Sequence, residues 1–415
     1  MPSVLSLPLP SRDFNLLDPD NLIHPAPLYS ALRERDPVHW SPDVGAWFVT
    51  RHEDVMACFR DPRLSADRLK FFEYQIQGLE KDIIREFMET TRNQMVMRVG
   101  VDHLRMRRQV GGGFTPQRME AMCAPIRATL EELLDGIWAR GRMNLAREIS
   151  YPLPTRVIAE LLGVPPEDRE RFQAWSDRLA DFAAPAAGMP MLDVARRANQ
   201  AMVEMKAYFL PLLEARREQP TPDLLTLLVQ AQEQGQLSSG ELLANAILLL
   251  FAGHTTTTDQ LSNCVHDLLS HPEQLRLLRE RPELLRAAVE EGLRFHPAVP
   301  FIFRVAVEDV RLRGQLIRAG DVVFLGLAAA NRDPRAFTNP DRFDITREPP
   351  QGRHLAFGFG AHHCIGAGLA RRQLEMGLSM LLERLPGLRL DESRPVRIKC
   401  HSLNFRGFEQ LPVRW

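Results

Sequence analysis

The chain has 415 residues, and its 52 Lys and Arg against 53 Asp and Glu give a formal charge of -1, which excludes bulk electrostatic attraction to nucleic acid. Its five cysteines are widely separated and odd in number, which favours a reducing compartment over a disulfide framework. No run reaches the roughly 18 consecutive apolar residues of a membrane span, and the proline-broken start lacks the apolar core of a signal peptide. We therefore expect no nucleic-acid partner, no membrane anchor and a cytoplasmic location.

The N-terminal quarter predicts a hairpin followed by short helices. Residues 37–50 alternate apolar side chains around a Pro42-Asp-Val-Gly45 turn, as strands of a β-hairpin do. Residues 64–99 mix aromatic and charged side chains irregularly, a pattern that favours short helices packed on a core.

A helix predicted over residues 101–110 places His103 and Arg107 four positions apart on one face. Two interpretations stay open here: a basic solvated helix, or two donors that meet the carboxylates of a bound group. The three glycines at 111–113 break this helix and have no functional explanation from the sequence alone. From about 117 to 237 the chain reads as successive amphipathic helices punctuated by prolines.

The longest predicted helix begins at a capping box, Ser238 with Glu241, and runs to Ser270. Residues 247–252 are apolar all round, which indicates a helix buried in the core. Four threonines follow at 255–258, and their hydroxyls can bond to earlier carbonyls and distort the helix, leaving room for a small ligand. A threonine-rich turn with satisfied hydroxyls is the alternative.

Two further elements precede the last motif. Residues 283–295 predict a helix in which Glu291 and Arg294 are spaced for an ion pair. Residues 297–306 suit a strand entering the core, and the alternation from 310 to 324 continues a small sheet.

The stretch from Phe357 to Gly366 reads Phe-Gly-Phe-Gly-Ala-His-His-Cys-Ile-Gly. Its glycines suit a tight loop that passes close to something large and flat, and Cys364 stands just before a predicted helix N-terminus, which favours a thiolate. A zinc site would need a second Cys/His cluster, which the chain lacks, and the glycine spacing does not match a dinucleotide fingerprint.

The pattern Phe-x-x-Gly-x-x-x-Cys-x-Gly resembles the haem-ligand loop of the cytochrome P-450 family. Recognisable blocks extend from about His103 to the helix after Gly366. The resemblance implies a mainly α fold with a small β lobe, a single domain over residues 1–415 with its β-rich parts at about 37–50 and 299–325. It also implies haem b between the long helix and the loop of Cys364.

The resemblance assigns the site residues. It implies that Cys364 is the axial ligand of the haem iron, that Gly253 gives space, and that the Thr256 hydroxyl hydrogen-bonds dioxygen. The acidic residue usual before that threonine is replaced by Thr255, so a proton relay would use Thr255, water or Asp259. The other residues expected to bind the cofactor are His103, Arg107, Arg304, His362, Phe357, Gly358 and Gly366.

Other residues receive structural or substrate roles from the same resemblance. Glu291 and Arg294 match a structural pair that would meet Arg342 in a later loop. Residues 182–192 match a mobile lid that admits substrate. The candidates for the substrate pocket are Val299, Phe301, Ile302, Leu249, Ala252, Leu403 and Asn404.

The implied activity is a monooxygenase that inserts one oxygen atom of O2 into an apolar or amphipathic small molecule, by hydroxylation or epoxidation, such as a polyketide or terpenoid of secondary metabolism. Electrons from NAD(P)H would arrive through a separate ferredoxin and ferredoxin reductase or a flavodoxin-like donor, attracted by arginines on the Cys364 side. Those arginines are Arg105, Arg108, Arg353, Arg371 and Arg372. Two alternatives remain: a haem-thiolate enzyme that uses peroxide or acts as a dehydratase, and a non-catalytic haem sensor or carrier.

Overall fold

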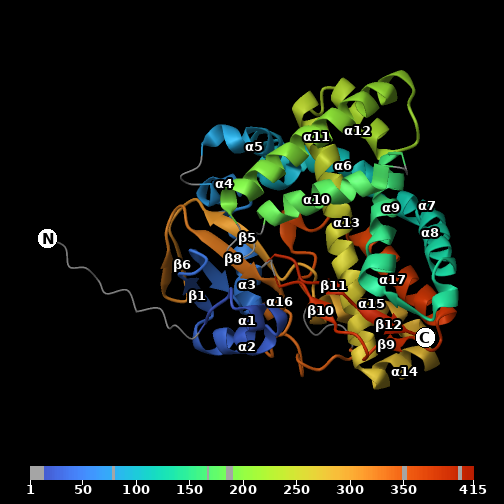
Figure 1. Ribbon diagram of the computed structural model, residues 1–415. Helices are drawn as coiled ribbons and strands as arrows, with labels where there is room; N and C mark the ends of the chain where they lie inside the picture. The colour runs from blue at the N-terminus through green and yellow to red at the C-terminus, as the bar shows by residue number, and fades with distance from the viewer. Residues whose placement is uncertain (1–13, 77–79, 166–167, 184–189, 348–352, 401–403) are drawn as a thin grey trace.

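The computed structural model describes residues 14–76, 80–165, 168–183, 190–347, 353–400 and 404–415. It is mainly helical, with the largest sheet gathered on one side of the molecule (Figure 1). The expected fold class, mainly α with a small β lobe, is confirmed. Leu403 and most of the expected lid segment, residues 184–189, lie outside the described residues.

Helix α13 (Ser239–Ser270) runs through the middle of the helical part (Figure 1). Its N-terminus has the predicted capping box: the Glu241 backbone N–H donates to Ser238 Oγ at 3.2 Å, and the Ser238 N–H donates to Glu241 Oε2 at 2.9 Å. Most of its residues are buried, because other helices pack on several of its sides. The predicted long, buried helix is therefore confirmed.

Helices α9, α11, α15 and α17 pack against α13, and α10 packs against α11. None of the helices in the described ranges is long and apolar enough to cross a bilayer. Besides α13, the helices are α1 (Pro19–Ile23), α2 (Ala26–Arg35), α3 (His52–Arg60), α4 (Leu69–Gln75), α5 (Arg85–Arg92), α6 (Gly100–Gly111), α7 (Pro116–Ala121), α8 (Cys123–Asp135), α9 (Pro152–Leu162), α10 (Arg169–Ala183), α11 (Met191–Glu218), α12 (Leu224–Glu233), α14 (Pro272–Glu280), α15 (Leu285–Phe295), α16 (Leu327–Ala330) and α17 (Ala367–Arg384).

The largest sheet has the strand order β1-β2-β8-β5-β3. The predicted hairpin at 37–50 is present as β1 and β2, paired antiparallel with Val38 opposite Val49 and Ser41 opposite Ala46. Strand β2 pairs parallel with β8, which pairs antiparallel with β5. The five strands are β1 (Val38–Ser41), β2 (Ala46–Val49), β3 (Leu64–Ser65), β5 (Phe301–Ala306) and β8 (Val322–Gly326).

Three smaller sheets complete the β structure, in the orders β4-β12-β9, β10-β11 and β6-β7. The hairpin β10-β11 lies against the middle of the molecule, because β11 contacts α13. These strands are β4 (Arg142–Asn144), β6 (Val310–Leu312), β7 (Gln315–Ile317), β9 (Arg389–Leu390), β10 (Arg397–Ile398), β11 (Phe408–Gln410) and β12 (Pro412–Arg414).

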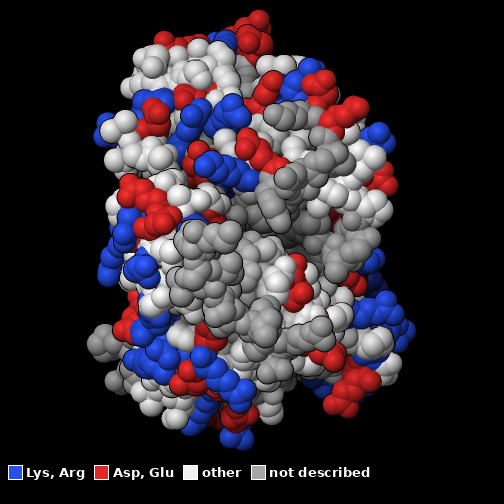
Figure 2. Space-filling model, turned by 90° about the vertical axis from the view of Figure 1, so that its left-hand side faces the viewer, with Lys and Arg blue, Asp and Glu red and all other residues white. Residues whose placement is uncertain are grey.

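The hydrophobic core follows from these elements. One large cluster fills the space between the helices around α13. Two smaller clusters cover the two faces of the largest sheet, since neighbouring residues of a strand point to opposite faces: Phe48 belongs to one cluster and Val49 to the other. On the face shown in Figure 2, basic and acidic side chains are interspersed, in line with the net charge of -1.

The glycine run at 111–113 has a packing explanation. A β-carbon at Gly113, just after α6, would stand 2.4 Å from Leu224 Cδ1, so a side chain there would require the Leu224 side chain of α12 to shift. Gly112 has open space around it. The third glycine therefore leaves space for the Leu224 side chain of α12.

Candidate active site

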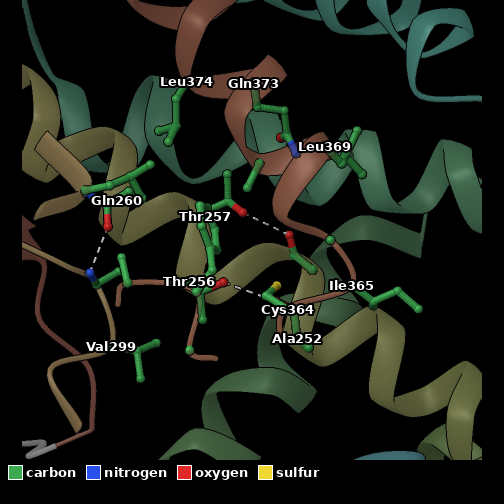
Figure 3. A pocket seen from close by; sticks show the side chains of 18 of the residues that line it. Ala252, Thr256, Thr257, Gln260, Val299, Cys364, Ile365, Leu369, Gln373 and Leu374 are labelled. Carbon is green, nitrogen blue, oxygen red and sulfur yellow. Dashed lines mark hydrogen bonds between the residues drawn. The ribbon is translucent and has the colours of Figure 1, made fainter. Parts of the chain in front are cut away.

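A cavity of about 260 Å³ lies between α13 and the loop that precedes α17. Thr256 and Thr257 of α13 and Cys364 of the loop point into it (Figure 3). Most of the remaining wall is apolar, as is usual for small-molecule sites. The described residues that line it are Phe114, Ile158, Leu249, Ala252, Gly253, Thr256, Thr257, Gln260, Leu293, Ala298, Val299, Ile302, Leu327, Ala356, Phe357, Gly358, His362, Cys364, Ile365, Gly366, Leu369, Ala370, Gln373 and Leu374.

Two glycines shape the loop that carries Cys364. The φ angle is 67° at Gly358 and 77° at Gly360, in the left-handed region that residues with a β-carbon rarely adopt. The Cys364 N–H donates to the Phe357 carbonyl at 2.9 Å, and α17 begins at Ala367. The loop therefore holds the thiol at the cavity surface beside the helix N-terminus, as the sequence predicted.

The surroundings of Cys364 act on the pKa of its thiol in two directions. The many protein atoms around the sulfur raise this pKa, and the backbone N–H groups of Gly366 and Ala367 and the charges of Arg107 and Arg371 lower it by less. The helix N-terminus thus acts in the expected direction, and the thiolate state of Cys364 stays a prediction. A metal bound at the sulfur would supply the missing positive charge, because a coordinating thiol is deprotonated.

The threonine run forms the α13 side of the cavity. Thr256 Oγ1 donates to the Ala252 carbonyl at 3.2 Å and Thr257 Oγ1 to the Gly253 carbonyl at 3.4 Å (Figure 3). These are the predicted bonds to earlier carbonyls, but α13 continues as an α-helix through them. A β-carbon at Gly253 would stand 2.7 Å from Ile158 Cδ1, so this glycine also lets α9 approach.

The next two expected proton-relay residues lie in different surroundings. Thr255 Oγ1 lies 3.4 Å from Nε2 of the buried His254, and burial lowers the pKa of that imidazole to about 4. Asp259 lies outside the cavity wall, 2.7 Å from Lys399 Nζ, so a part in the proton relay stays a prediction. The cavity stripe of α13 repeats at 249, 252, 253, 256, 257 and 260, and position 259 falls off that stripe toward the β10-β11 hairpin.

Helix α6 contacts the Cys364 loop through His103 and Arg107. The rings of His103 and His362 stack with centroids 3.9 Å apart, and Arg107 Nη2 donates to the His363 carbonyl at 2.6 Å. Burial and then the neighbouring His103 and arginines lower the pKa of His362 to about 3. The fold thus brings His103, Arg107 and His362 together beside the cavity, with His362 neutral at pH 7.

Arg304 lies in β5, and its guanidinium is buried without an acidic partner. Nη1 donates to the Phe303 carbonyl at 3.0 Å and Cζ lies 5.2 Å from the centre of the Phe59 ring, but no carboxylate of the described residues pairs with it. Burial and then the charge of Arg68 lower the pKa of Arg304 to about 9. A buried unpaired charge is costly, so the residue fits a ligand that brings a carboxylate. Together with the cavity-facing sulfur of Cys364, it fits haem.

The Glu-x-x-Arg pair forms, but its third member is not the expected one. Glu291 and Arg294 bond through both carboxylate oxygens at 2.7 and 2.8 Å. The second arginine at Glu291 is Arg347, with Nε 3.2 Å from Oε2. Arg342 was therefore a wrong prediction: it offers only its carbonyl to Arg294, at 3.2 Å, and its side chain is 66% exposed beside Asp344.

The expected substrate wall is present in part. Val299, Ile302, Leu249 and Ala252 line the cavity, whereas Phe301 is wrong because its ring packs against Phe48 and Tyr29 in the core. Successive residues of β5 point to opposite faces, so 302 faces the cavity when 301 faces the core. Asn404 is outside the cavity wall, and Leu403 lies outside the described residues.

Several cavity residues were not predicted, among them Gln260. Gln260 accepts a hydrogen bond from the Ala298 N–H at 2.8 Å (Figure 3) and donates to the carbonyls of Gly292 and His296, both at 3.2 Å. It thereby fixes α13 to the segment that leads into β5. Its position one turn after Thr256 was the available sequence signal.

Comparisons with known proteins place the chain in a family. The family model for cytochrome P-450 matches residues 176–402. The chain is 40% identical over 396 residues to the mycinamicin IV hydroxylase/epoxidase of Micromonospora griseorubida, covering 93% of this chain and 94% of that protein. It is 36% identical over 400 residues to the polyketide biosynthesis cytochrome P-450 PksS of Bacillus subtilis, covering 94% and 95%.

A solved structure agrees over the whole fold. The crystal structure of P-450BioI in complex with hexadec-9Z-enoic acid ligated acyl carrier protein superposes with a TM-score of 0.87 at 34% identity, covering 96% of this chain and 100% of that one. The chain belongs to the cytochrome P-450 family of haem-dependent monooxygenases, which are oxidoreductases that use O2.

Proposed function

We propose that this monooxygenase hydroxylates or epoxidises an apolar or amphipathic small molecule of secondary metabolism, such as a polyketide or terpenoid. The apolar wall formed by Leu249, Ala252, Val299 and Ile302 supports this substrate class, because it offers contact area with few charges. Two relatives, a hydroxylase/epoxidase and a polyketide biosynthesis enzyme, point the same way.

The observation that carries the proposal is that Cys364 and Thr256 point into one cavity from opposite elements (Figure 3). Cys364 would bind the haem iron through its sulfur. When bound, haem supplies the oxidising chemistry, and a thiolate ligand favours O–O cleavage. The chain supplies the binding groups, the orientation of the substrate, exclusion of water and protons.

Four residues would hold the haem carboxylates: His103, Arg107, Arg304 and His362. Arg107 and Arg304 bring positive charge, and the two imidazoles bring N–H donors. Their convergence from α6, β5 and the Cys364 loop supports this role. Phe357, Gly358 and Gly366 would lie against the ring, since all three line the cavity.

Protons would be held on the Oγ1 of Thr256, with Thr255 behind it. The bond from Thr256 to the Ala252 carbonyl keeps this hydroxyl at the cavity surface. Thr255 cannot ionise as an acid would, and its contact with His254 Nε2 supplies a polar partner instead. Water would complete the path.

The primary test is the absorption spectrum of the reduced protein with carbon monoxide. A thiolate-ligated haem gives a strongly red-shifted band, and Cys364→Ser should abolish it. A purified protein without haem, or the spectrum of a histidine-ligated haem, would refute the site. Product formation with NAD(P)H and surrogate redox partners then tests the monooxygenase reaction, and a screen for compounds that shift the haem spin state tests the substrate class.

The electron donor would be a separate ferredoxin with its reductase, or a flavodoxin-like protein, drawing on NAD(P)H. Of the expected docking arginines, Arg105, Arg371 and Arg372 are paired with Glu241, Glu290 and Glu120. Arg108 and Arg353 form no ion pair with a described carboxylate, so these two are the better candidates to attract an acidic partner. A faster reduction rate at low salt, lost in Arg108→Glu, would support the docking role.

Peroxide-driven or dehydratase chemistry is a second candidate, favoured by one observation. The usual acid is replaced by Thr255, and Asp259 is committed to Lys399. Turnover with peroxide alone, at a rate above that with electron donors, would favour this class. Spectral binding of substrates without any turnover would instead favour a sensor or carrier. A single domain over residues 1–415 and a cytoplasmic location stay predictions.

A further inference from the structure

Arg68 is a second arginine without an acidic ion-pair partner near the Cys364 loop, and its side chain is half-buried. It lies between β3 and α4, where Nη2 donates to the Val96 carbonyl at 3.3 Å and Cζ lies 5.1 Å from the centre of the Phe303 ring. Its Nε is buried and makes no hydrogen bond within the described part of the chain, in which no carboxylate pairs with the guanidinium. The charge of Asp67 acts on the guanidinium without forming an ion pair, so Arg68 can take a further anion as a direct hydrogen-bond partner.

Arg68 and Arg304 share Phe303 as a neighbour. Arg68 stands over its ring, and Arg304 donates to its carbonyl at 3.0 Å. The charge of Arg68 lowers the pKa of both Arg304 and His362, so it lies within electrostatic reach of two residues expected to bind the cofactor. Two like charges held together in a protein interior repel one another unless an anion separates them.

We propose that Arg68 and Arg304 jointly bind one carboxylate of haem, an inference that rests on the proposed function of the cavity. A carboxylate accepts several hydrogen bonds, and each guanidinium offers donors in a planar fork that matches it. The Nε of Arg68 is enclosed by protein atoms, so the Nη groups of Arg68 and the remaining donors of Arg304 would meet such an anion. His103, Arg107 and His362 serve the other carboxylate.

The first test measures transfer of haem from the ferric holoenzyme to apomyoglobin. Loss of a hydrogen-bonded charge should speed haem release from Arg68→Gln about tenfold, and Arg68→Lys should recover part of the loss because it keeps the charge. Arg63→Gln is the matched control: Arg63 belongs to the same segment, but its side chain is 43% exposed and paired with Asp61, so haem release from this variant should equal that of the wild type.

Two further readouts separate binding from a merely structural role. We compare the haem-release rate of the double variant, Arg68→Gln with Arg304→Gln, with the rates of the two single variants. If both arginines bind one carboxylate, the increase in the double variant should be smaller than the product of the two single increases. The propionate bending band in the resonance Raman spectrum should also shift in Arg68→Gln. Multiplicative effects, or an unshifted band, would overturn the proposal.

A substrate carboxylate is the competing ligand for Arg68. Haem release and substrate binding by the same variants distinguish the two ligands. Unchanged haem release in Arg68→Gln, with weakened spectral binding of palmitate, would assign Arg68 to the substrate and overturn the inference. Failure of the proposed function is distinguishable, because then the wild type itself would lack the thiolate-haem spectrum. A normal wild-type spectrum with unaltered Arg68 variants would remove only this inference.

Discussion

Arg347 Nε lies 3.2 Å from Oε2 of Glu291, and through its other nitrogens Arg347 donates to the carbonyls of Thr338, Asn339 and Arg342. This one side chain therefore fixes the loop at 338–342 to helix α15. The neighbouring Arg342 side chain is largely exposed. The two arginines should differ sharply in their contribution to stability.

Arg347→Gln is expected to lower the free energy of unfolding by about 2 kcal/mol, because the buried Glu291 loses a charge-assisted hydrogen bond. Arg342→Gln is the matched control and should change it by less than about 0.5 kcal/mol. Chemical denaturation followed by far-UV circular dichroism measures both. If both variants lost the same free energy of unfolding, Arg347 would not be the main partner of Glu291.

Thr256→Ala is expected to raise peroxide formation relative to product by several-fold, because the cavity loses the hydroxyl that faces Cys364 (Figure 3). Thr258→Ala is the control, since Thr258 lines a different pocket with Lys399 and Tyr151. The measurement is peroxide and product per NAD(P)H consumed. Unchanged coupling in Thr256→Ala would argue against this hydroxyl.

Ile302→Ala is expected to change substrate affinity or the position of oxidation while leaving the fold intact, because Ile302 lines the cavity. Phe301→Ala should instead cost about 3–5 kcal/mol of stability, since its ring fills the core between Phe48 and Tyr29. Product analysis and denaturation curves of the two variants check this reversal. A Phe301→Ala protein of normal stability would contradict the assignment.

The acid side of the stability profile should depend on His254. Burial lowers the pKa of this imidazole from 6.5 to about 4 in the folded protein, so between these values the unfolded chain takes up a proton that the folded chain does not. The free energy of unfolding therefore falls as pH drops from 6.5 to 4, by up to about 1.4 kcal/mol per pH unit.

His254→Asn should flatten that part of the profile relative to the wild type. His24→Asn is the control, because His24 is exposed. Denaturant titrations at a series of pH values measure both slopes. The same acid slope in His254→Asn as in the wild type would exclude this residue as the source.

The sequence predicted the elements whose signal is local. The capping box of Ser238 and Glu241, the all-apolar run at 247–252 and the glycines around Cys364 each act within one turn or loop, and the structure has the expected long helix and loop there. The stacking of His103 on His362 was not predicted, but the family resemblance had singled out both residues.

The errors concern which way a side chain points. Alternation in β5 could not say whether Phe301 or Ile302 faces the cavity, because the phase of a strand depends on the partner sheet. Asp259 lies one turn from Thr255 in sequence but faces Lys399, a residue 140 positions away. Arg68 could not be predicted from the sequence, because a single arginine in a loop has no periodic signal.

The contact between Asp259 and Gly407 restricts how this enzyme can be altered. A β-carbon at Gly407 would stand 2.1 Å from Oδ1 of Asp259, the same oxygen that Lys399 holds at 2.7 Å. The β10-β11 hairpin and helix α13 therefore pack closely at this point and are linked by the Lys399–Asp259 ion pair. A residue with a β-carbon at 407 therefore requires Asp259 or the hairpin to shift, so a redesign of this hairpin also changes the surroundings of α13.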